Sequence, residues 1–357
     1  MGGGPAGSAA ARFLAAHGMD TLLVERDFSF VKPCGGGIPS TALPDLGIPE
    51  KPVRKHVHAL RVVSPGGDTL NVKLDGGSIA IVERGDFDHV LRTEAERSGA
   101  RLLEAEFRRF EDMGRTVTVQ LALDQPPHLM TVQADYVIAA DGVNSRVRAA
   151  LDIKPSPSIL TVSEKIKGEE SDACEFWFGS SHAPRCYSWV FPQKEGVSAG
   201  TGAFGDTEIR SLWQRFLVRR GLKSEGAFRG YRIPLWQGDL YHQGRILFVG
   251  DAAGQVMPFT CEGIYYAMKS GEFAATAVLA GKAGDYKKLW EKRFQKRFSL
   301  MKKLWAYFLK GDHRAEKIVQ VHKRPEVREM SLALWLRKDS SKESLLSYIN
   351  IFRRFLG

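Results

Sequence analysis

Short apolar runs that end in glycine turns and lead into helical patterns recur through this chain of 357 residues. Runs at 21–24, 135–140 and 246–249 have the composition of strands buried in a parallel sheet. The last run ends in Gly250-Asp251, and a helical pattern opens at Gly263. Strands that alternate with helices in this way predict an α/β domain with a doubly wound sheet.

A second pattern is typical of antiparallel strands. Residues 59–82 alternate between apolar and polar positions, with a hairpin signal at Gly66-Gly67. Residues 175–204 are strand-like and rich in aromatic side chains. These two segments predict a separate, antiparallel substrate domain.

The last part of the chain predicts an amphipathic helix, because apolar side chains recur at spacings of three or four among many basic residues. The apolar stripe consists of Trp290, Phe294, Phe298, Met301, Trp305 and Phe308. One interpretation is a helix on an anionic membrane surface, with Trp and Phe below the headgroups. The other is a helix packed on the protein with a solvated basic back.

The charge is unevenly distributed. From Tyr286 onward there are 19 Lys or Arg against 7 Asp or Glu, a net of +12, so the remainder carries −2 of the total of +10. Nucleic-acid binding is not expected, because the basic residues accompany an apolar stripe. There is no run of 18 apolar residues.

The chain has four cysteines and no CxxC pair, which predicts a reducing compartment and hence a cytoplasmic protein. No metal site is expected. Cys174 and Cys186 are expected to be separate buried thiols rather than a disulfide bridge.

The start of the chain carries a dinucleotide-binding pattern. Gly2, Gly4 and Gly7 have the G-x-G-x-x-G spacing, and a helical pattern follows at once. Glu25 ends the next strand and is the expected partner of an adenosine ribose. The motif is normally preceded by a central strand, yet only Met1 stands before Gly2. We therefore expect a gap in the sheet with two unpaired neighbours, and hypothesise that the natural chain begins six to ten residues earlier, about one strand length.

Three further segments are candidates for a flavin site. The loop Lys32 to Pro39 is rich enough in glycine, at Gly35 and Gly37 among others, for its backbone to lie against a planar ring. Its Cys34 is either a small buried residue at a turn or a thiol that positions a substrate or relays a proton. Arg84 either reaches a phosphate or the flavin rim, or is a surface residue paired with Asp88.

The turns after the buried strands suit an anionic, sugar-containing ligand. Asp141-Gly142, followed by a basic helical start, suggests phosphate contacts. Asp251 is placed to accept hydrogen bonds from a ribityl chain, and the helix that opens at Gly263 directs free N–H groups and a dipole at a partly anionic group. Each turn alone is also consistent with an ordinary strand-turn-helix corner.

Tyr187, Trp189 and Phe191 occupy alternate positions of a predicted strand and therefore share one face. They are suited to line a long apolar pocket, and the alternative is that they pack the core beneath the sheet.

The glycine motif, Asp141-Gly142 and Gly250-Asp251 resemble the three signatures of flavoproteins with the p-hydroxybenzoate hydroxylase fold. Within that class, residues 32–39 and 263–271 are similar to the geranylgeranyl reductase family, including its chlorophyll-type members, and Tyr187 to Pro192 matches that family's Y-x-W-x-F-P motif. The resemblance runs from Gly2 to about Gly281. It departs from the family at Cys261, where many members have Gly, and at the absent first strand.

The resemblance implies a Rossmann-like FAD-binding domain, an antiparallel-sheet substrate domain and a helical tail. The expected boundaries are 1–57, 84–153 and 239–281 for FAD binding, 58–83 and 154–238 for the prenyl substrate, and 282–357 for the basic helical region.

It also implies an FAD enzyme that saturates isolated double bonds of a prenyl lipid or prenyl diphosphate, with NADPH or a reduced ferredoxin as electron donor. A lipid substrate favours association with a membrane surface. FAD would be held by Ala6, Glu25, Cys34, Gly35, Arg84, Asp251, Gly263 and Ile264, and the prenyl chain by Tyr187, Trp189 and Phe191. The alternatives are a flavin monooxygenase of the same fold, and an isoprenoid-binding chain without flavin.

Overall fold

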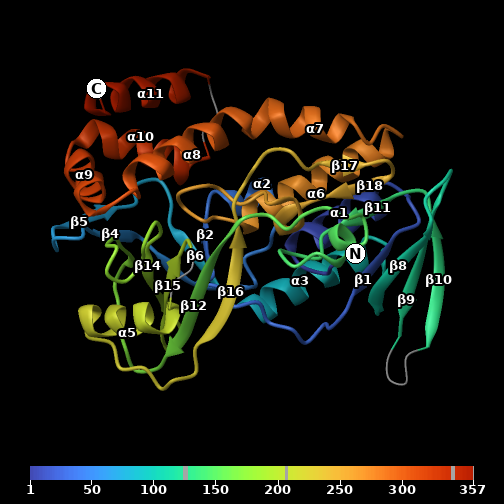
Figure 1. The fold of residues 1–357 in the computed structure, drawn as a ribbon, viewed down its shortest axis with the longest axis horizontal. Coiled ribbons are helices and arrows are strands. Elements are labelled where there is room, and N and C mark those ends of the chain that lie inside the picture. The colour runs from blue at the N-terminus through green and yellow to red at the C-terminus, as the bar shows by residue number, and fades with distance from the viewer. Residues whose placement is uncertain (124–127, 206–207, 339–341, 357) are drawn as a thin grey trace. The chain divides into compact units, whose positions relative to one another are not determined.

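The computed structural model describes residues 1–123, 128–205, 208–338 and 342–356 (Figure 1). The chain forms two compact units, each assembled from three segments. The first unit comprises 1–31, 85–157 and 233–295, and the second comprises 32–84, 158–232 and 296–357. Residues 32–57, which we expected in the FAD-binding domain, therefore lie in the second unit. The helical tail is divided between the two units.

The first unit has the alternating strands and helices that the apolar runs predict. Its elements are α1 (Pro5–Ala16), β1 (Leu22–Glu25), α3 (Arg84–Arg97), β7 (Arg101–Glu104), β8 (Glu106–Asp112), β9 (Val117–Ala122), β10 (Leu129–Ala134), β11 (Val137–Ala139), α4 (Arg146–Ala149), β17 (His242–Gln243), β18 (Ile246–Phe248), the 3-10 turn η1 (Gly250–Ala253), α6 (Ile264–Leu279), α7 (Asp285–Trp290) and the π turn η2 (Glu291–Gln295).

The parallel strands form two pieces. β1 pairs with β7, β11 pairs with β18, and β17 completes the second piece. Met1 lies where the two pieces meet: its amino group donates to Ile138 O at 3.0 Å, and its carbonyl accepts from Ala140 N at 2.7 Å. Gly2 N donates to Val24 O on the other side, at 2.7 Å. Met1 and Gly2 therefore link the two pieces by backbone hydrogen bonds in the described part of the chain.

Helices α1 and α6 cross closely because small residues meet at their contact. A Cβ added to Gly271 of α6 would overlap the backbone of Ala6 in α1. Close backbone approach of this kind requires glycine. The crossing fixes the start of α1 against the end of the β18 turn, because Gly250 also lies against Ala6.

The second unit is built on antiparallel sheets, as the alternation at 59–82 and 175–204 predicts. Its elements are β2 (Gly37–Pro39), α2 (Ala42–Asp45), β3 (Val53–Val57), β4 (Ala59–Val63), β5 (Thr69–Lys73), β6 (Ile79–Val82), β12 (Ser158–Ile166), β13 (Cys174–Trp177), β14 (Ser188–Gln193), β15 (Gly196–Ala203), α5 (Ile209–Arg220), β16 (Arg229–Pro234), α8 (Lys296–Phe308), α9 (Asp312–His322), α10 (Pro325–Trp335) and α11 (Lys342–Leu356).

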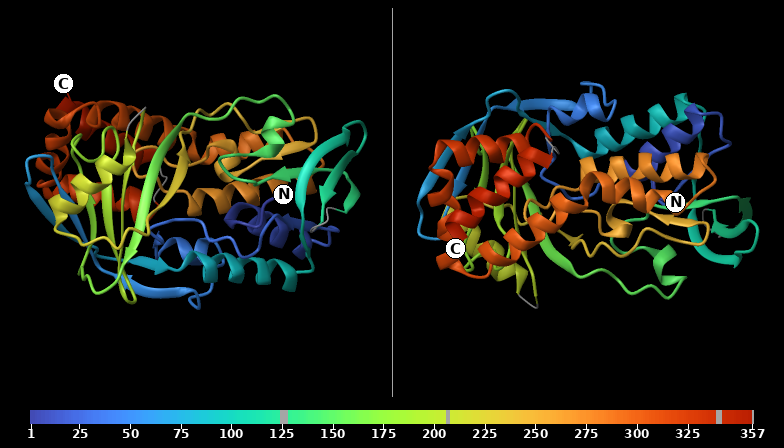
Figure 2. Two further views of the ribbon diagram at one scale, coloured as in Figure 1. Left: turned by 60° about the horizontal axis from the view of Figure 1, so that its bottom comes forward. Right: turned by 90° about the horizontal axis from the view of Figure 1, so that it is seen from above.

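Seven strands form the main sheet in the order β16-β12-β15-β14-β13-β4-β5, and β2, β6 and β3 form a smaller one. The predicted hairpin at Gly66-Gly67 joins β4 to β5. Because side chains alternate along a strand, the two faces of the main sheet have different partners. On one face Val190 shares an apolar cluster with Trp213 and Phe216 of α5, and on the other Phe191 packs against a cluster that includes Leu332 of α10. The ribbons of α5 and of the C-terminal helices lie on opposite sides of this sheet (Figure 2).

The aromatic side chains of the tail's apolar stripe are buried in the protein, whereas Met301 is half-buried. Trp290 and Phe298 are fully buried, and Phe294 packs against Tyr265 and Tyr266 of α6. The continuous amphipathic helix that we expected is instead α7, η2 and α8. These aromatic side chains are therefore not available to dip into a membrane, and the packed interpretation is correct for the stripe. Arg297 is also buried, unlike the solvated basic residues around it.

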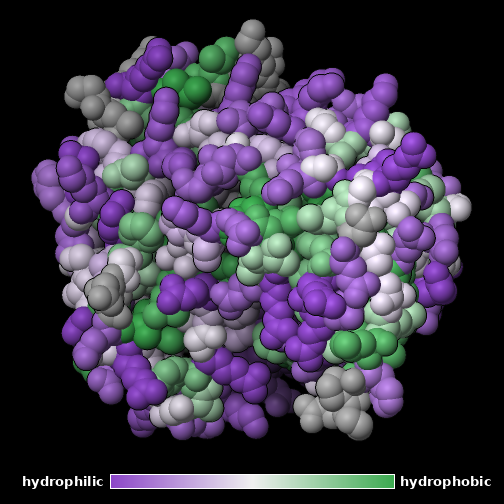
Figure 3. Space-filling view, turned by 45° about the vertical axis from the view of Figure 1, so that its right-hand side comes forward, coloured by the Kyte–Doolittle hydropathy of each residue, from purple (hydrophilic) through white to green (hydrophobic). Residues whose placement is uncertain are grey.

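All four cysteines are free, with Cys174 and Cys186 separately buried. Burial raises the pKa of the Cys174 thiol above its ordinary value. Among the described residues, none of the helices is both long enough and apolar enough to cross a membrane. Hydrophilic side chains predominate on the side of the surface shown in Figure 3, and hydrophobic ones gather there in smaller groups.

A hydrogen-bonded network is buried beside β14 in the second unit. His182 Nδ1 lies 2.7 Å from Ser188 Oγ, Ser188 Oγ donates to Thr201 Oγ1 at 2.8 Å, and Thr201 Oγ1 donates to the carbonyl of His182 at 2.6 Å. Burial, assisted by the charge of Arg219, lowers the pKa of His182 to about 4. The network therefore holds a neutral imidazole near neutral pH.

Candidate functional site

The glycine motif of the first unit separates into packed and open positions. A Cβ on Gly7 would overlap the carbonyl of Gly2, and a Cβ on Gly2 would overlap Ala140. Gly4, in contrast, has no atom within 4 Å of such a Cβ. Gly2 and Gly7 thus permit tight packing, whereas Gly4 leaves open space in front of the start of α1.

The start of α1 is prepared for a negatively charged group. Gly4 is its N-cap residue, no side chain caps the helix, and Pro5 follows in the first turn. Free N–H groups and the helix dipole at such an end favour an anion. Glu25 stands beside this turn: its Oε2 accepts from Gly3 N at 2.6 Å, and its Oε1 accepts from Arg26 N at 2.8 Å.

Asp251 and Gly263 lie close together after β18. A Cβ on Gly263 would be 3.8 Å from Asp251 Oδ1. Gly263 is the N-cap of α6, whose first turn has no side-chain cap, and Ile264 begins the helix. The turn depends on Gly250, which has a φ of 58°. A Cβ added to Gly250 would be only 3.0 Å from the Cβ of Ala6. The carboxylate and an open helix start are therefore brought to one place.

The Asp141-Gly142 turn has a structural role in α4. Asp141 accepts from Ser145 Oγ at 2.6 Å and from Val147 N at 3.1 Å, so its carboxylate holds the start of that helix. Gly142 has a φ of 83°, which favours glycine.

The basic start of α4 contacts protein groups rather than an open site. Arg146 forms an ion pair with Glu106. Arg148 is buried and donates to Ser156 Oγ at 2.8 Å and to Ala252 O at 3.2 Å. Both guanidinium groups therefore have protein partners, and the phosphate contacts that we expected at this turn stay a prediction.

In the second unit, the glycine loop lies directly on the aromatic stripe. A Cβ on Gly35 would be 2.8 Å from Phe191 Cδ2 and 3.3 Å from Trp189 Nε1. A Cβ on Gly37 would be 3.0 Å from Phe191 Cε2. A side chain at Gly35 would therefore force the ring of Phe191 to shift, and one at Gly37 would be tighter than an ordinary packing contact. The structure thus joins two segments that we singled out separately in the sequence.

Side chains also hold this loop in place. Gln193, at the end of β14, donates from Nε2 to the carbonyl of Gly35 at 3.2 Å. Within the loop, Gly36 N donates to Cys34 Sγ at 3.3 Å. Cys34 is half-buried, so its thiol is ordered without being sealed in the core.

Tyr187, Trp189 and Phe191 form one aromatic surface, as the alternation predicts. The rings of Tyr187 and Trp189 are 6.4 Å apart, and Phe176 of β13 lies 5.4 Å from Tyr187 and 5.3 Å from Phe191. Gly200 of β15 supports the surface, because a Cβ there would overlap the ring of Trp189. From the sequence we named Phe176 only as one of the aromatic residues of this segment and did not name Gly200, since only strand pairing brings them to the stripe.

Arg84, at the start of α3, is 6% exposed, and Asp88 is 5% exposed. The interpretation of Arg84 as a surface residue is therefore wrong. A buried arginine needs polar partners to offset its desolvation.

Comparison with known proteins decides the family. Residues 1–286 match the family model described as an FAD binding domain. The chain is 32% identical to the geranylgeranyl diphosphate reductase of Rhodobacter capsulatus over 98% of this chain and 94% of the relative. The chain belongs to the geranylgeranyl reductase family of FAD-binding proteins. The enzyme of the same name from Synechocystis is 27% identical over 100% of this chain and 96% of the relative.

Solved structures confirm the fold of the geranylgeranyl reductase family. A geranylgeranyl bacteriochlorophyll reductase-like protein from Thermoplasma acidophilum superposes with a TM-score of 0.83 and 23% identity, covering 99% of this chain and 96% of that one. A flavin-dependent brominase superposes with a TM-score of 0.80 at 17% identity, covering 99% and 97%. Structural likeness at such low sequence identity shows only the fold, which is of the p-hydroxybenzoate hydroxylase type. Membership of the geranylgeranyl reductase family does not favour a monooxygenase or a protein without flavin.

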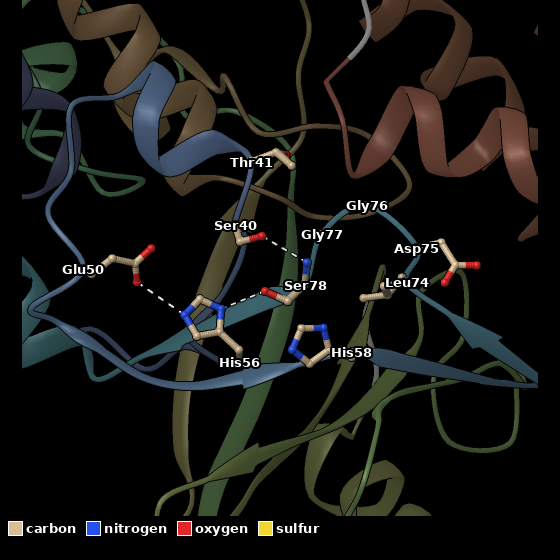
Figure 4. A pocket seen from close by; sticks show the side chains of 10 residues that line it. All are labelled: Ser40, Thr41, Glu50, His56, His58, Leu74, Asp75, Gly76, Gly77 and Ser78. Carbon is tan, nitrogen blue, oxygen red and sulfur yellow. Dashed lines mark hydrogen bonds and ion pairs between the residues drawn. The ribbon is translucent and has the colours of Figure 1, made fainter.

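The second unit also contains a polar hollow of about 510 Å³ that we did not predict. It is lined by Ser40, Thr41, Glu50, His56, His58, Leu74, Asp75, Gly76, Gly77 and Ser78 (Figure 4). His56 Nδ1 lies 2.7 Å from Ser78 Oγ, and its Nε2 lies 3.3 Å from Glu50 Oε2. Both ring nitrogens are thus engaged, and this polar lining does not suit the hydrocarbon chain that the family name implies.

Proposed function

We propose that this protein is an FAD-dependent oxidoreductase that saturates isolated double bonds of a geranylgeranyl or related prenyl chain. One observation carries the proposal. The loop 34–37, which we assign to the flavin ring, lies against Phe191 and Trp189, which we assign to the prenyl chain. A planar cofactor on that loop would therefore meet an aromatic, apolar wall.

The residues fit FAD on structural grounds. The open space at Gly4 and the uncapped start of α1 suit a pyrophosphate, and Glu25 beside them suits the adenosine ribose. Asp251 and the uncapped start of α6 at Gly263 suit the ribityl chain and the polar edge of the flavin. We propose that FAD is held by Gly2, Gly4, Ala6, Gly7, Glu25, Cys34, Gly35, Gly37, Arg84, Asp251, Gly263 and Ile264, with Asp141 and Gly142 shaping the turn beside it.

The chemistry requires a hydride at one alkene carbon and a proton at the other. Reduced FAD supplies the hydride when it is bound. An isolated alkene has no carbonyl for an acid to polarise, so the protein must act chiefly by holding the double bond in position. Tyr187, Trp189 and Phe191 perform this task by excluding water and confining the chain to the aromatic surface.

Cys34 is the proposed source of the proton or the residue that positions it. Its Sγ is held by the N–H of Gly36, and its neighbours in the loop lie on Phe191 and Trp189. A thiol is a weak acid, which suits proton delivery only when the acceptor carbon is held nearby. The proton that leaves Cys34 would be replaced from solvent.

The electron donor and the substrate class complete the proposal. NADPH or a reduced ferredoxin would return two electrons to FAD for each double bond reduced. The substrate would be a prenyl diphosphate or a prenyl lipid. Digeranylgeranylglycerophospholipid reductase of Methanothrix thermoacetophila, at 28% identity over 94% of each chain, is a relative whose name indicates a lipid substrate.

Association with an anionic membrane surface would bring the enzyme to a lipid substrate. Lys292, Lys296 and Lys303 are exposed, and a basic residue near such a surface contributes about 1 kcal/mol. Co-sedimentation with anionic vesicles, compared with neutral ones, tests this. Replacement of these lysines by Gln should weaken binding, whereas equal recovery with both kinds of vesicle would contradict electrostatic association.

The enzymatic proposal is tested by purifying the protein, recording its visible spectrum with FAD, and assaying it without oxygen. Dithionite-reduced protein should saturate geranylgeranyl diphosphate or a geranylgeranyl lipid. A colourless protein that takes up no FAD would overturn the proposal. A strict need for oxygen together with an oxygenated product would point to a monooxygenase instead.

A further inference from the structure

The turn that carries Asp251 is held by buried side chains of the first unit. The backbone N–H of Gly250 donates to two acceptors, Gln255 Oε1 at 3.0 Å and Ser270 Oγ at 2.9 Å. Gln255 N donates in return to the carbonyl of Gly250 at 2.9 Å, so the glycine and the glutamine are joined in both directions. Gln255 is 1% exposed and Ser270 is fully buried, so bulk water does not reach these contacts.

A tyrosine fixes the orientation of the Gln255 amide. A backbone N–H can only donate, so Gly250 requires the amide oxygen, and the amide nitrogen is left to face Tyr286. Gln255 Nε2 donates to Tyr286 Oη at 2.6 Å, and Tyr286 is fully buried in the first turn of α7. Burial raises the pKa of Tyr286 above its ordinary value, so the group stays a neutral hydroxyl. Tyr286 therefore orients the amide, and the amide holds the N–H of Gly250.

These contacts matter because the turn itself is made of glycine. Gly250 has a φ of 58° and Gly254 a φ of 67°, and a glycine backbone has more freedom than that of any other residue. The conformation of Gly250 must therefore be held by its partners. Asp251 follows directly, and its Oδ1 lies 3.8 Å from the position of a Cβ on Gly263. A change in the backbone angles of Gly250 would swing that carboxylate away from the start of α6.

We propose that Gln255 and Tyr286 are positioning residues for the flavin cofactor, which act through the backbone of Gly250 to hold Asp251 where the ribityl chain binds. This inference rests on the proposed function, which places the ribityl chain at Asp251. It also gives the beginning of the tail a part in cofactor binding, because Tyr286 belongs to the region 282–357 that we expected to lie outside the FAD-binding domain.

Removal of one member of this network leaves another without its partner. In Tyr286→Phe, the amide N–H of Gln255 loses its acceptor in a buried place, which favours rotation of the amide and release of Gly250. FAD binding must then restore the turn, so the FAD dissociation constant should rise about 5-fold to 100-fold. Gln255→Met keeps an unbranched side chain without either polar group, and it should have an effect at least as large.

Tyr241→Phe is the matched control. The ring of Tyr241 lies 5.7 Å from that of Tyr286, and the residue is 4% exposed. In the part of the chain that the structure describes, the Tyr241 hydroxyl has no hydrogen-bond partner, so its removal breaks none of the contacts to Gly250. The measurements are fluorescence titration with FAD and thermal melts of the apo proteins. FAD affinity should fall in Tyr286→Phe and Gln255→Met and match the wild type in Tyr241→Phe.

A double-mutant cycle tests whether the two residues act as one unit. In the Gln255→Met background, Tyr286→Phe should cause no further loss of FAD affinity. Additive losses, or a lower melting temperature of the apo protein with FAD affinity unchanged, would overturn this inference and leave the proposed function intact. If Gln255→Met does not fold, the comparison of Tyr286→Phe with Tyr241→Phe decides alone. Wild type that binds no FAD would overturn the proposed function, and this inference with it.

Discussion

Gly35 lies against Phe191 so closely that a Cβ on the glycine would be 2.8 Å from the phenyl ring. The glycine belongs to a loop before β2, and the phenylalanine belongs to β14. Their contact brings the proposed flavin loop and the proposed prenyl wall together within one compact unit.

The first prediction concerns this contact. Gly35→Ala should lower kcat/KM for the prenyl substrate about 5-fold to 100-fold, because overpacking by a methyl group typically costs 1–3 kcal/mol and would displace the loop or the ring. Gly230→Ala is the matched control, since its nearest neighbour would be an ordinary 3.8 Å away. Steady-state kinetics of both variants provide the comparison. Wild-type kinetics in Gly35→Ala would show that the contact has no role in turnover.

The second prediction separates binding from folding in the glycine motif. Gly4→Ala should leave the apo protein stable but weaken FAD binding about tenfold or more, because the new methyl group enters space that is open without the cofactor. Gly7→Ala should instead lower the free energy of unfolding by about 1–3 kcal/mol, since its Cβ overlaps Gly2. Thermal melts of the apo proteins and fluorescence titration with FAD distinguish the two effects. Equal FAD affinity in Gly4→Ala and wild type would exclude a pyrophosphate at that position.

The third prediction concerns Cys34. Cys34→Ala should retain the yellow flavin and lose most of its turnover, because the proton donor is removed while the loop backbone is kept. Cys34→Ser should be intermediate, since a hydroxyl keeps a proton but is a weaker acid. Absorbance spectra and anaerobic kinetics measure the two properties separately. If Cys34→Ala reduces prenyl chains as fast as wild type, the thiol has no part in the mechanism.

The fourth prediction is a pH dependence of stability. The pKa of His182 is about 4 in the folded protein, against 6.5 ordinarily, so below pH 6.5 the unfolded chain binds a proton that the folded chain does not. Stability should therefore be complete above pH 6.5 and fall between pH 6.5 and 4, by up to about 1.4 kcal/mol for each pH unit. Burial lowers the pKa of His322 in the same direction.

Urea unfolding at several pH values tests this dependence. His182→Asn should flatten the acid slope, while His17→Gln, at an exposed position, should leave it unchanged. An unchanged slope in His182→Asn would assign the acid sensitivity to other groups.

Local features of this protein could be predicted from the sequence. The hairpin at Gly66-Gly67 and the start of α6 at Gly263 follow from turn chemistry that acts within a few residues. The separately buried thiols of Cys174 and Cys186 followed from the lack of a CxxC pair.

Features that depend on distant contacts could not be predicted. Periodicity revealed the stripe through Phe294 and Phe298, but a period does not say whether protein or lipid covers a stripe. Asp141 has the sequence context of a ligand-binding turn, yet its carboxylate is used within α4. The contact between Gly35 and Phe191 depends on the folding of the whole second unit, so neither segment alone indicates it.

The central claim is that reduced FAD and a prenyl chain meet at the Gly35 loop and that no oxygen is required. The most direct measurement is a single turnover without oxygen, in which protein carrying reduced FAD is mixed with a geranylgeranyl substrate and the reoxidised flavin is compared with the product mass. The account predicts one double bond saturated, with two hydrogens gained, for each FAD reoxidised. Reoxidation only when oxygen is admitted, with the prenyl chain unchanged, would contradict it.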